Sequence, residues 1–523
     1  MISHSPIDAR VQKALEGIRA AEWEQVPASV ESLLEVILEV FQENAEKIRQ
    51  LEERAEKLAR ENQQLWEQLR RNSGNSSQPP SSDFGQKEKP KSQRKKSERN
   101  RGGQPGHAGH QRNLVPVEQC QKVIDHYPKC CKKCGEKLQG QDPDPYRHQV
   151  VEIPPVQPEV EEHRLHELAC AHCGEKTRAG LPEGVSLSGY GARVKAVVAL
   201  LGGVYRASQR MTASAMEDLF GIEMSLGTVN QLRQQMSQAL AEPVEEAHQY
   251  IQEQRIVHAD ETGFRQGNAD GNNPGGKKAW LWVAVTSLVT VFHVTLSRGQ
   301  ESARRLLGEA FAGILISDRW NGYNWIRTVR RQFCWAHLKR EFQKIAERDG
   351  ASRTLGEALL EAGEKLFSLW HRVRDGTLSR RQFKRQVKEI RRQVQWLLSA
   401  GADYCLKKGD KSLRAKTART CRELLKMEEA LWLFVEQEGV EPTNNAAERA
   451  IRPAVLWRHV SFGTESESGS QFVARMLTVA ATLRSQQRNI LDFLCQATNT
   501  YRQGVASPSL LPITIAPEGA LAA

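Results

Sequence analysis

With 523 residues, the chain is too long to fold around a single hydrophobic core, so three or more folded units are expected. Hydrophobic residues make up 39% of the chain and include 11 Trp, which excludes a protein that is disordered throughout. The formal net charge is +11, and residues 87–112 alone carry +7 of it, from nine Lys or Arg against two Glu. This uneven basic charge favours a polyanionic partner.

Two observations indicate the cellular compartment. The most apolar window, residues 280–294, is too short and too polar to span a membrane, and the first residues lack the apolar segment of a secretory signal. Ten cysteines, four of them in two Cys-x-x-Cys pairs, suit a reducing environment and metal binding better than disulfides. We therefore expect a cytoplasmic protein with no membrane partner.

The first segment, residues 1–71, is predicted to be helical. Between residues 34 and 69, apolar residues recur with alternating spacings of three and four over more than five heptads, with Leu51, Leu58 and Leu65 at d positions. This pattern predicts a coiled coil and hence a homodimer. The alternative is a single amphipathic helix packed on the rest of the chain.

A basic linker follows at residues 72–115. It is rich in Ser, Pro, Gly and Lys and almost without apolar residues, which is typical of a disordered arm. Its cations would contact DNA phosphates with an affinity that falls as salt rises; a solvated linker without a partner is the alternative. The candidate DNA contacts are Lys95, Lys96, Arg99 and Arg101.

Residues 116–182 contain the two Cys-x-x-Cys pairs, with 35 residues between the pairs and a Gly directly after each. The four cysteines are Cys131, Cys134, Cys170 and Cys173. Two such turns predict one tetrahedral Zn²⁺ site, which would be structural because four thiolates leave no open position. Cys130 is a competing ligand for the first pair, and free thiols in a loop are the alternative. We expect small strands near residues 146–160.

A helical module is predicted at residues 183–250. Gly221 at a turn and Ser225 as the cap of the following helix have the rhythm of a helix-turn-helix; a plain helical hairpin fits equally well. Residues 251–340 then predict three strands, a helix and a fourth strand. These elements are expected at residues 256–259, 280–285, 289–294, 301–307 and 314–316.

Three acidic residues, far apart in the sequence, are the candidates for catalysis. Asp260 and Asp318 follow the first and fourth predicted strands, and sites in open α/β sheets form at the carboxyl ends of strands. Glu448 belongs to a helix predicted within residues 441–453. Three converging carboxylates would hold Mg²⁺ or Mn²⁺, which prefer oxygen ligands. Two such ions would activate a water and stabilise the leaving oxygen of a phosphodiester.

Each of these acids also has a purely structural explanation. Asp260 and Asp318 could be ordinary turn formers, given the Thr-Gly and Asn-Gly that follow them. Asn445 and Glu448 fit a capping box, in which the Glu only folds back on the start of its helix. Glu261 could be mistaken for the ligand, but strand alternation directs it to the opposite face from its neighbour.

The remaining segments complete the predicted organisation. Residues 341–440 are helical and highly charged, and they read as an insertion, because 130 positions separate the second acid from the third. Residues 441–500 would complete the catalytic core, with a last amphipathic helix at 472–494. The tail at 501–523 is expected to be mobile.

Several motifs together carry a resemblance to a known family. They are His258-Ala259-Asp260-Glu261-Thr262, Ser317-Asp318, Gly322-Tyr323, Cys334-Trp335-Ala336-His337, the run from Asn444 to Pro453, and Asn75 to Asp83 with Gly102 to His107 in the linker. In combination they resemble the insertion-sequence-sixty-six family of bacterial DDE transposases over about residues 34–499. The resemblance implies a multidomain α+β protein with an RNase H-like α/β catalytic core and a helical insertion.

The resemblance also implies roles for particular residues. Asp260, Asp318 and Glu448 would be the catalytic triad, and His337 would touch the scissile DNA or order the site; a buried helix start is the alternative for this histidine. Arg449 and Arg452 follow Glu448 by one residue and about one helical turn, where their guanidinium groups could grip DNA phosphates.

We therefore expect a nucleoid-associated DNA transposase that binds transposon ends and performs metal-dependent hydrolysis and strand transfer. Small helper proteins are a further implication of the resemblance. The alternatives are a non-catalytic, dimeric zinc DNA-binding protein and a structure-selective nuclease of the same fold.

Overall fold

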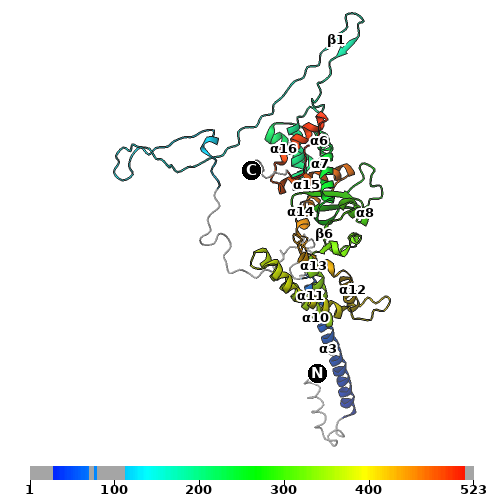
Figure 1. The fold of residues 1–523 in the computed structure, drawn as a ribbon. Helices are drawn as coiled ribbons and strands as arrows, with labels where there is room; N and C mark the ends of the chain where they lie inside the picture. The colour runs from blue at the N-terminus through cyan, green and yellow to red at the C-terminus, as the bar shows by residue number, and fades with distance from the viewer. Residues whose placement is uncertain (1–26, 70–75, 79–111, 513–523) are drawn as a thin grey trace. The chain divides into compact units, whose positions relative to one another are not determined.

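The computed structural model describes residues 27–69, 76–78 and 112–512 (Figure 1). By its internal contacts the chain divides into two units, residues 1–95 and 96–523, each of which we describe by itself. The proposed DNA contacts in the linker, Lys95, Lys96, Arg99 and Arg101, lie outside the described residues.

The first unit contains one long helix, α3 (Ala28–Leu69), which confirms the helix predicted there. Apolar side chains at the heptad positions are open to solvent: Ile48 is 58% exposed, Leu51 64% and Leu58 51%. Ion pairs one turn apart, such as Arg60 with Glu56 at 2.9 Å, line the helix surface. The coiled-coil dimer stays a prediction.

The segment from residue 112 to 182 has little regular structure. Its two strands, β1 (Glu167–Ala169) and β2 (Lys176–Arg178), pair antiparallel, and a short 3₁₀ turn lies at Val117–Gln119. The strands expected near residues 146–160 are absent from this described segment, so that prediction was wrong. Tyr146 is 92% exposed and Val160 89%, because no second layer covers the alternating apolar side chains.

A helical module precedes the sheet. It consists of α4 (Ala192–Ala199), a π-helical turn (Leu200–Val204), α5 (Gln209–Phe220), α6 (Leu226–Ala239) and α7 (Ala241–Gln252). Gly221 ends α5 with a φ of 64°, and the Ser225 side chain caps α6 by accepting from the Thr228 N–H, as the sequence predicted. Arg233 packs over the Phe472 ring at 4.4 Å and is therefore held against the protein.

A five-stranded mixed sheet forms the centre of the second unit. Its strands are β3 (Ile256–Phe264), β4 (Ala279–Val285), β5 (Thr290–Thr295), β6 (Ile314–Ser317) and β7 (Arg331–Phe333), in the spatial order β5-β4-β3-β6-β7. The pairs β3–β4 and β4–β5 are antiparallel, whereas β6 is parallel to both β3 and β7. The helix α8 (Gln300–Leu307) connects β5 with β6. This order confirms the predicted succession of three strands, helix and strand.

Two later helices pack on the sheet and close its core. They are α14 (Asn445–Ser461), which contacts β3 and β4, and α15 (Glu467–Ser485), which contacts β5 (Figure 1). Trp282 and Phe292 from the sheet and Trp457 and Phe472 from the helices are buried in this core. Pro453 lies inside α14 without ending it. The segment that follows the insertion thus returns to the strands that carry the predicted aspartates.

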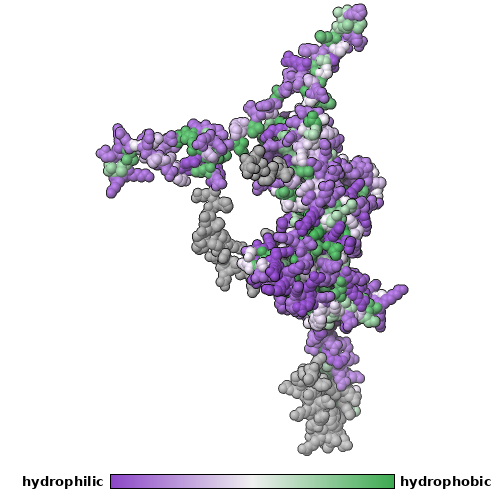
Figure 2. Space-filling model, in the orientation of Figure 1, coloured by the Kyte–Doolittle hydropathy of each residue, from purple (hydrophilic) through white to green (hydrophobic). Residues whose placement is uncertain are grey.

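The helical segment after β7 packs into a second core, which also includes Ile316 of β6 and Phe333 of β7. The segment contains α9 (Trp335–Ala346), α10 (Ala351–Arg374), α11 (Arg380–Ala402), α12 (Leu413–Lys426) and α13 (Glu429–Glu436). Trp335, Trp370, Phe383 and Trp432 pack together there, and α13 joins the insertion to β7. On the face drawn in Figure 2, the surface over α10 and α11 is mainly hydrophilic.

Two predictions about the end of the chain were wrong. The helix expected at residues 472–494 is two helices, α15 and α16 (Ile490–Gln503), because Gln487 adopts a positive φ of 56° and Asn489 caps a new helix. The tail is not mobile as far as residue 511: Leu510 is fully buried and Ser509 donates to Glu246 at 2.8 Å. Among the described residues, no helix has both the length and the apolar character that a membrane crossing requires.

Candidate active site

The two predicted aspartates lie side by side at one edge of the sheet. The β3–β6 ladder ends with His258 opposite Ile316, and Asp260 and Asp318 each follow two residues later. The prediction that the first strand ends at residue 259 was wrong, because β3 continues to Phe264 as the hairpin partner of β4. The two aspartates therefore lie where β6 ends, whereas β3 continues beyond this point.

The acidic side chains at this edge act on each other electrostatically. Burial raises the pKa of Asp260 well above its usual value, and the charges of Glu261, Asp318 and Glu448 raise this pKa further. The Glu261 backbone N–H donates to Asp260 Oδ1 at 2.9 Å, which opposes the rise. The structure thus brings the three predicted carboxylates into one electrostatic neighbourhood, although they come from β3, the turn after β6, and α14.

Asn444 ties the start of α14 to β3. Its Nδ2 donates to the Ala259 carbonyl at 2.8 Å, its Oδ1 lies 3.2 Å from His258 Nδ1, and its backbone N–H donates to Cys334 Sγ at 3.2 Å. Asn444 is only 1% exposed. The Trp335 N–H donates to the Pro442 carbonyl at 2.9 Å, which fixes the same loop to α9. Glu448 is thereby held in the first turn of a helix anchored one residue before Asp260.

This arrangement overturns the structural explanation of Glu448. The N-cap of α14 is Asn444 rather than Asn445, and no side chain caps this helix. A capping box needs the Glu to accept from the N-cap backbone N–H, which here donates to sulfur. Glu448 instead faces His337, whose Nδ1 lies 3.5 Å from Glu448 Oε1.

The surroundings of the site lower the pKa of two histidines. Burial lowers the pKa of His258 to about 4, opposed by its hydrogen bond to Asn444 and assisted by the charge of Arg449. Burial also lowers the pKa of His337, with a contribution from Arg340, while Asp318 and Glu448 act in the opposite direction. His337 is therefore influenced by Arg340 of α9 and by the acids Asp318 and Glu448, the second of which lies 3.5 Å away.

Glu261, the neighbour of Asp260, is fully committed to other contacts. Arg298 donates to its Oε1 through Nε at 3.0 Å and Nη2 at 2.8 Å, and the Tyr323 hydroxyl donates to its Oε2 at 2.9 Å. The Arg298 guanidinium lies over the rings of Trp280 and Trp320, at 4.7 and 5.0 Å. The sequence placed Glu261 on the face opposite Asp260 but gave no sign of Arg298 as its partner.

A buried cation lies beside the turn that carries Asp318. Arg331 in β7 is 2% exposed, and its Nη2 donates to the Asp318 carbonyl at 3.3 Å. Burial lowers the pKa of Arg331 to about 10, and the charge of Asp318 opposes this. The Asp318 carboxylate accepts from the Trp320 N–H at 3.0 Å, so its position is fixed by the turn after β6. Sequence reasoning missed Arg331 as well.

The basic residues around the site lie in two groups. Arg449 and Arg452 are exposed on α14, and among the described residues neither forms an ion pair. Further along β3, beyond Asp260, a cavity of about 690 Å³ has cations and no carboxylate in its lining. Its four cations are Arg265, Lys277, Lys278 and Arg458.

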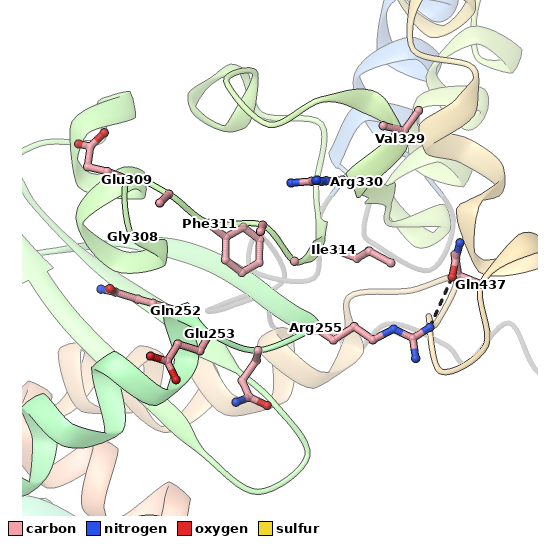
Figure 3. A pocket seen from close by; sticks show the side chains of 14 residues that line it. Gln252, Glu253, Arg255, Gly308, Glu309, Phe311, Ile314, Val329, Arg330 and Gln437 are labelled. Carbon is pink, nitrogen blue, oxygen red and sulfur yellow. Dashed lines mark hydrogen bonds between the residues drawn. The ribbon is translucent and has the colours of Figure 1, made fainter.

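A second cavity lies elsewhere. It measures about 940 Å³ and is lined by Arg255, Gly308, Ile314 and neighbouring residues at the amino ends of β3 and β6 (Figure 3). Arg255 and Gln437 are joined across it by a hydrogen bond of 3.4 Å (Figure 3). None of the predicted catalytic residues lines this cavity, so it belongs to the opposite end of the strands.

Both Cys-x-x-Cys pairs form the same backbone turn. The Cys131 N–H donates to the Glu136 carbonyl and the Cys170 N–H to the Glu175 carbonyl, both at 2.8 Å. Backbone N–H groups, first that of the second cysteine of each pair, lower the pKa of the Cys131 and Cys170 thiols. This places Cys131 rather than Cys130 in the turn. Among the described residues the two pairs are not gathered into one four-thiol cluster.

Comparisons with known proteins give the relatives of this chain. A model described as the Transposase IS66 family matches residues 203–472, just over half of the chain. One described as the zinc-finger binding domain of transposase IS66 matches residues 128–174, which contain both cysteine pairs. This match supports Zn²⁺ as the ion that the cysteines bind. A third, for a family of unknown function, matches residues 18–113.

Two curated proteins of Sinorhizobium fredii are also similar. The uncharacterized protein y4qI is 29% identical over 278 residues, and the uncharacterized protein y4hP is 28% identical over 207 residues. These alignments cover 49% and 36% of this chain and the same shares of the relatives, so the chain spans half or less of the length of either.

Proposed function

This chain belongs to the IS66 family of transposases, and we propose that it cuts and joins DNA at transposon ends with divalent metal ions held by Asp260, Asp318 and Glu448. One observation carries the proposal: the charges of Asp318 and Glu448 both raise the pKa of Asp260. Carboxylates that repel each other in this way are stabilised when a proton or a cation binds near them, and the ligand atoms of these three acids are not gathered within 4.8 Å of one another in the structure. A DDE enzyme needs three such acids at one point.

The sheet supports an RNase H-like core for this chemistry. Three antiparallel strands, a connecting helix and two parallel strands, in the order β5-β4-β3-β6-β7, are the arrangement we assign to that core. In this proposal residues 251–340 and 441–500 form the catalytic domain, and residues 341–440 are an insertion that packs into the second core. Residues 1–71, 72–115, 116–182 and 183–250 are the dimerisation segment, the arm, the zinc domain and a helical module.

The donors at the site fit Mg²⁺ or Mn²⁺. Asp260, Asp318 and Glu448 offer only carboxylate oxygens, and Glu448 Oε1 is buried without a hydrogen-bond partner. When bound, two ions would lower the pKa of the attacking water and neutralise charge on the phosphate. The chain's own contribution is position: Asn444 fixes the helix of Glu448 against β3, and Arg331 fixes the turn of Asp318.

Several surfaces would hold the DNA. Arg449 and Arg452 project from the helix that carries Glu448, and the basic cavity beside β3 continues from Asp260. DNA phosphates bound by Arg449, Arg452 and the cations of this cavity would bring the scissile bond to the three acids, and His337 would lie beside the scissile bond. We assign the arm, with Lys95, Lys96, Arg99 and Arg101, and the zinc domain to the transposon ends as well.

The exposed apolar stripe of α3 is assigned to a second copy of the chain, which would hold two transposon ends in one complex. Small helper proteins and a cytoplasmic, nucleoid-associated location complete the proposal.

The test uses DNA ends from the inverted repeats that flank the gene. Mg²⁺-dependent cleavage of these ends is expected to disappear in Asp260→Ala, Asp318→Ala and Glu448→Ala while DNA binding survives. Binding without cleavage by the unaltered chain would favour the zinc DNA-binding alternative. Cleavage without joining of a pre-cut end to target DNA would favour the nuclease.

A further inference from the structure

A second set of metal-ligand atoms lies beside Glu448. Cys334, His337 and Glu448 each offer one such atom, and all three atoms lie within 4.8 Å of one another. In the part of the chain that the structure describes, this is the one group of three or more Cys, His, Asp or Glu side chains that meets so closely. The proposed Mg²⁺ site uses neither the thiol nor the imidazole, so the group needs its own explanation.

The contact between His337 and Glu448 is not a hydrogen bond. Nδ1 and Oε1 are 3.5 Å apart, and both atoms are buried without a hydrogen-bond partner. Such a pair of unsatisfied buried atoms is unfavourable. Two ligands of one tetrahedral zinc-type ion, each about 2.0–2.2 Å from the metal, lie about 3.4 Å apart. The observed separation therefore matches two atoms that share a metal ion.

Burial, with the charge of Glu448, raises the pKa of the Cys334 thiol to about 11, so the thiol keeps its proton until an ion binds. Nearby N–H groups favour the thiolate that binding would form. Cys334 is the N-cap of α9, so the positive end of the helix dipole points at it. The Asn444 N–H donates to its Sγ at 3.2 Å, a contact that thiolates bound to metals commonly receive. A sulfur ligand and an oxygen or nitrogen ligand of one such ion lie about 3.6 Å apart, so a shift of about 1 Å brings Sγ to the ion.

We propose that Cys334, His337 and Glu448 form a binding site for a thiophilic divalent ion such as Zn²⁺, and that this ion competes with the catalytic metal for Glu448. A thiolate and an imidazole select ions of this class over Mg²⁺. Binding replaces the S–H bond of Cys334 with a sulfur–metal bond and releases the proton to solvent, without electron transfer.

The site has a regulatory consequence. An ion bound there occupies the Glu448 carboxylate that the catalytic metal needs. Micromolar Zn²⁺ is therefore expected to stop the cleavage that millimolar Mg²⁺ supports, and removal of Zn²⁺ should restore cleavage. This consequence rests on the proposed function of Glu448. The ion site itself does not, because it can be observed without DNA.

Cobalt titration of the full chain tests the site directly. Co²⁺ bound to a thiolate gives a sulfur-to-metal charge-transfer absorption, and the zinc-domain cysteines contribute equally in every variant compared here. We expect the unaltered chain to show one equivalent of this absorption more than Cys334→Ser. Cys421→Ser is the matched control, because Cys421 is also fully buried but lies in the helical insertion, and its absorption should equal that of the unaltered chain.

Three further measurements make the outcome decisive. His337→Gln, which keeps the thiol, should weaken Co²⁺ binding roughly 10–100-fold, and the Zn²⁺ concentration that halves cleavage should rise at least about 10-fold in Cys334→Ser. Asp260→Asn should leave the cobalt signal unchanged. Equal cobalt absorption in the unaltered chain and Cys334→Ser overturns the site, even if the protein cuts DNA. A cobalt signal at Cys334 in a protein that never cuts DNA would leave the site standing and refute the proposed function alone.

Discussion

Replacing Asn444 with Ala tests the idea that one buried amide holds the active site together. The amide joins three elements: its Nδ2 donates to Ala259 in β3, its Oδ1 contacts His258, and the residue begins α14. The substitution leaves the Ala259 carbonyl and the His258 N–H buried without partners. Each lost bond of this kind costs about 1–3 kcal/mol, so we expect a loss of about 2–5 kcal/mol.

Thermal unfolding, followed by the fluorescence of the buried tryptophans, measures this loss. For a domain of 150–250 residues, each kcal/mol lowers Tm by about 2–4 °C, so the transition of the sheet domain should fall by roughly 5–15 °C. Cleavage should fall even at temperatures where the variant is folded, because Glu448 is no longer fixed beside Asp260.

Asn445→Ala is the matched control. Asn445 is the next residue, begins the same helix, is exposed, and makes no side-chain hydrogen bond to a described residue. It should unfold and cleave like the unaltered chain. If Asn444→Ala stays within about 0.5 kcal/mol of Asn445→Ala in stability and cleaves equally well, the view that Asn444 positions Glu448 is refuted.

Three other predictions concern separate parts of the molecule. Cys131→Ser and Cys170→Ser should each abolish the Zn²⁺ bound by the zinc domain, measured by metal analysis in a Cys334→Ser background, while Cys130→Ser keeps it; zinc loss in the last variant would reassign the first ligand. The double variant Lys277→Ala with Lys278→Ala should lower DNA affinity and reduce the slope of log affinity against log salt by up to about 2, whereas Arg385→Ala with Lys388→Ala on α11 should not; equal slopes in both would remove the cavity beside β3 from the DNA path. Burial, assisted by the charges of His248 and Arg305, lowers the pKa of His293 to about 3, below its unfolded value of about 6.5, so the unfolded chain binds the extra proton as pH falls. Stability should therefore drop by about 2 kcal/mol from this group between pH 6.5 and 5, and His293→Asn should flatten this part of the pH dependence of Tm; an unchanged profile would contradict it.

Sequence patterns were most informative where a residue's local surroundings decide its structure. The Cys-x-x-Cys-Gly turns, the Gly221 turn and the Ser225 cap all depend on a few neighbouring residues, and all occur as expected. The strands around Asp260 and Asp318 were found because short apolar runs mark buried strands. The wrong predictions, such as strands at residues 146–160 and one helix at 472–494, came from patterns that need a packing partner or that one backbone angle interrupts.

The candidate active site shows the same contrast between features that local sequence predicts and features that only packing decides. Alternation along β3 predicted that Glu261 faces away from Asp260, and the structure shows that this carboxylate is buried and therefore requires a partner. Nothing in the sequence identifies Arg298, which lies 37 positions away and on another element. Asn444 was visible in a motif, but its neighbour Asn445 fitted the cap equally well, and only the contact with Ala259 distinguishes them.

The sequence by itself determined the kinds of groups this protein can bring to chemistry: three acids, two pairs of thiols, and cations on the helix of Glu448. Hydrophobic periodicity and turn residues also determined which segments are strands and helices, because those preferences act over a few residues. Only the tertiary structure decided that Glu448 of α14 and Asp318 after β6 both raise the pKa of Asp260 in β3, and that the ligand atoms of Cys334 and His337 lie near Glu448. Such proximity depends on how separate elements pack. A buried contact such as that of Asn444 with β3 cannot be recognised from the sequence of either segment that it joins.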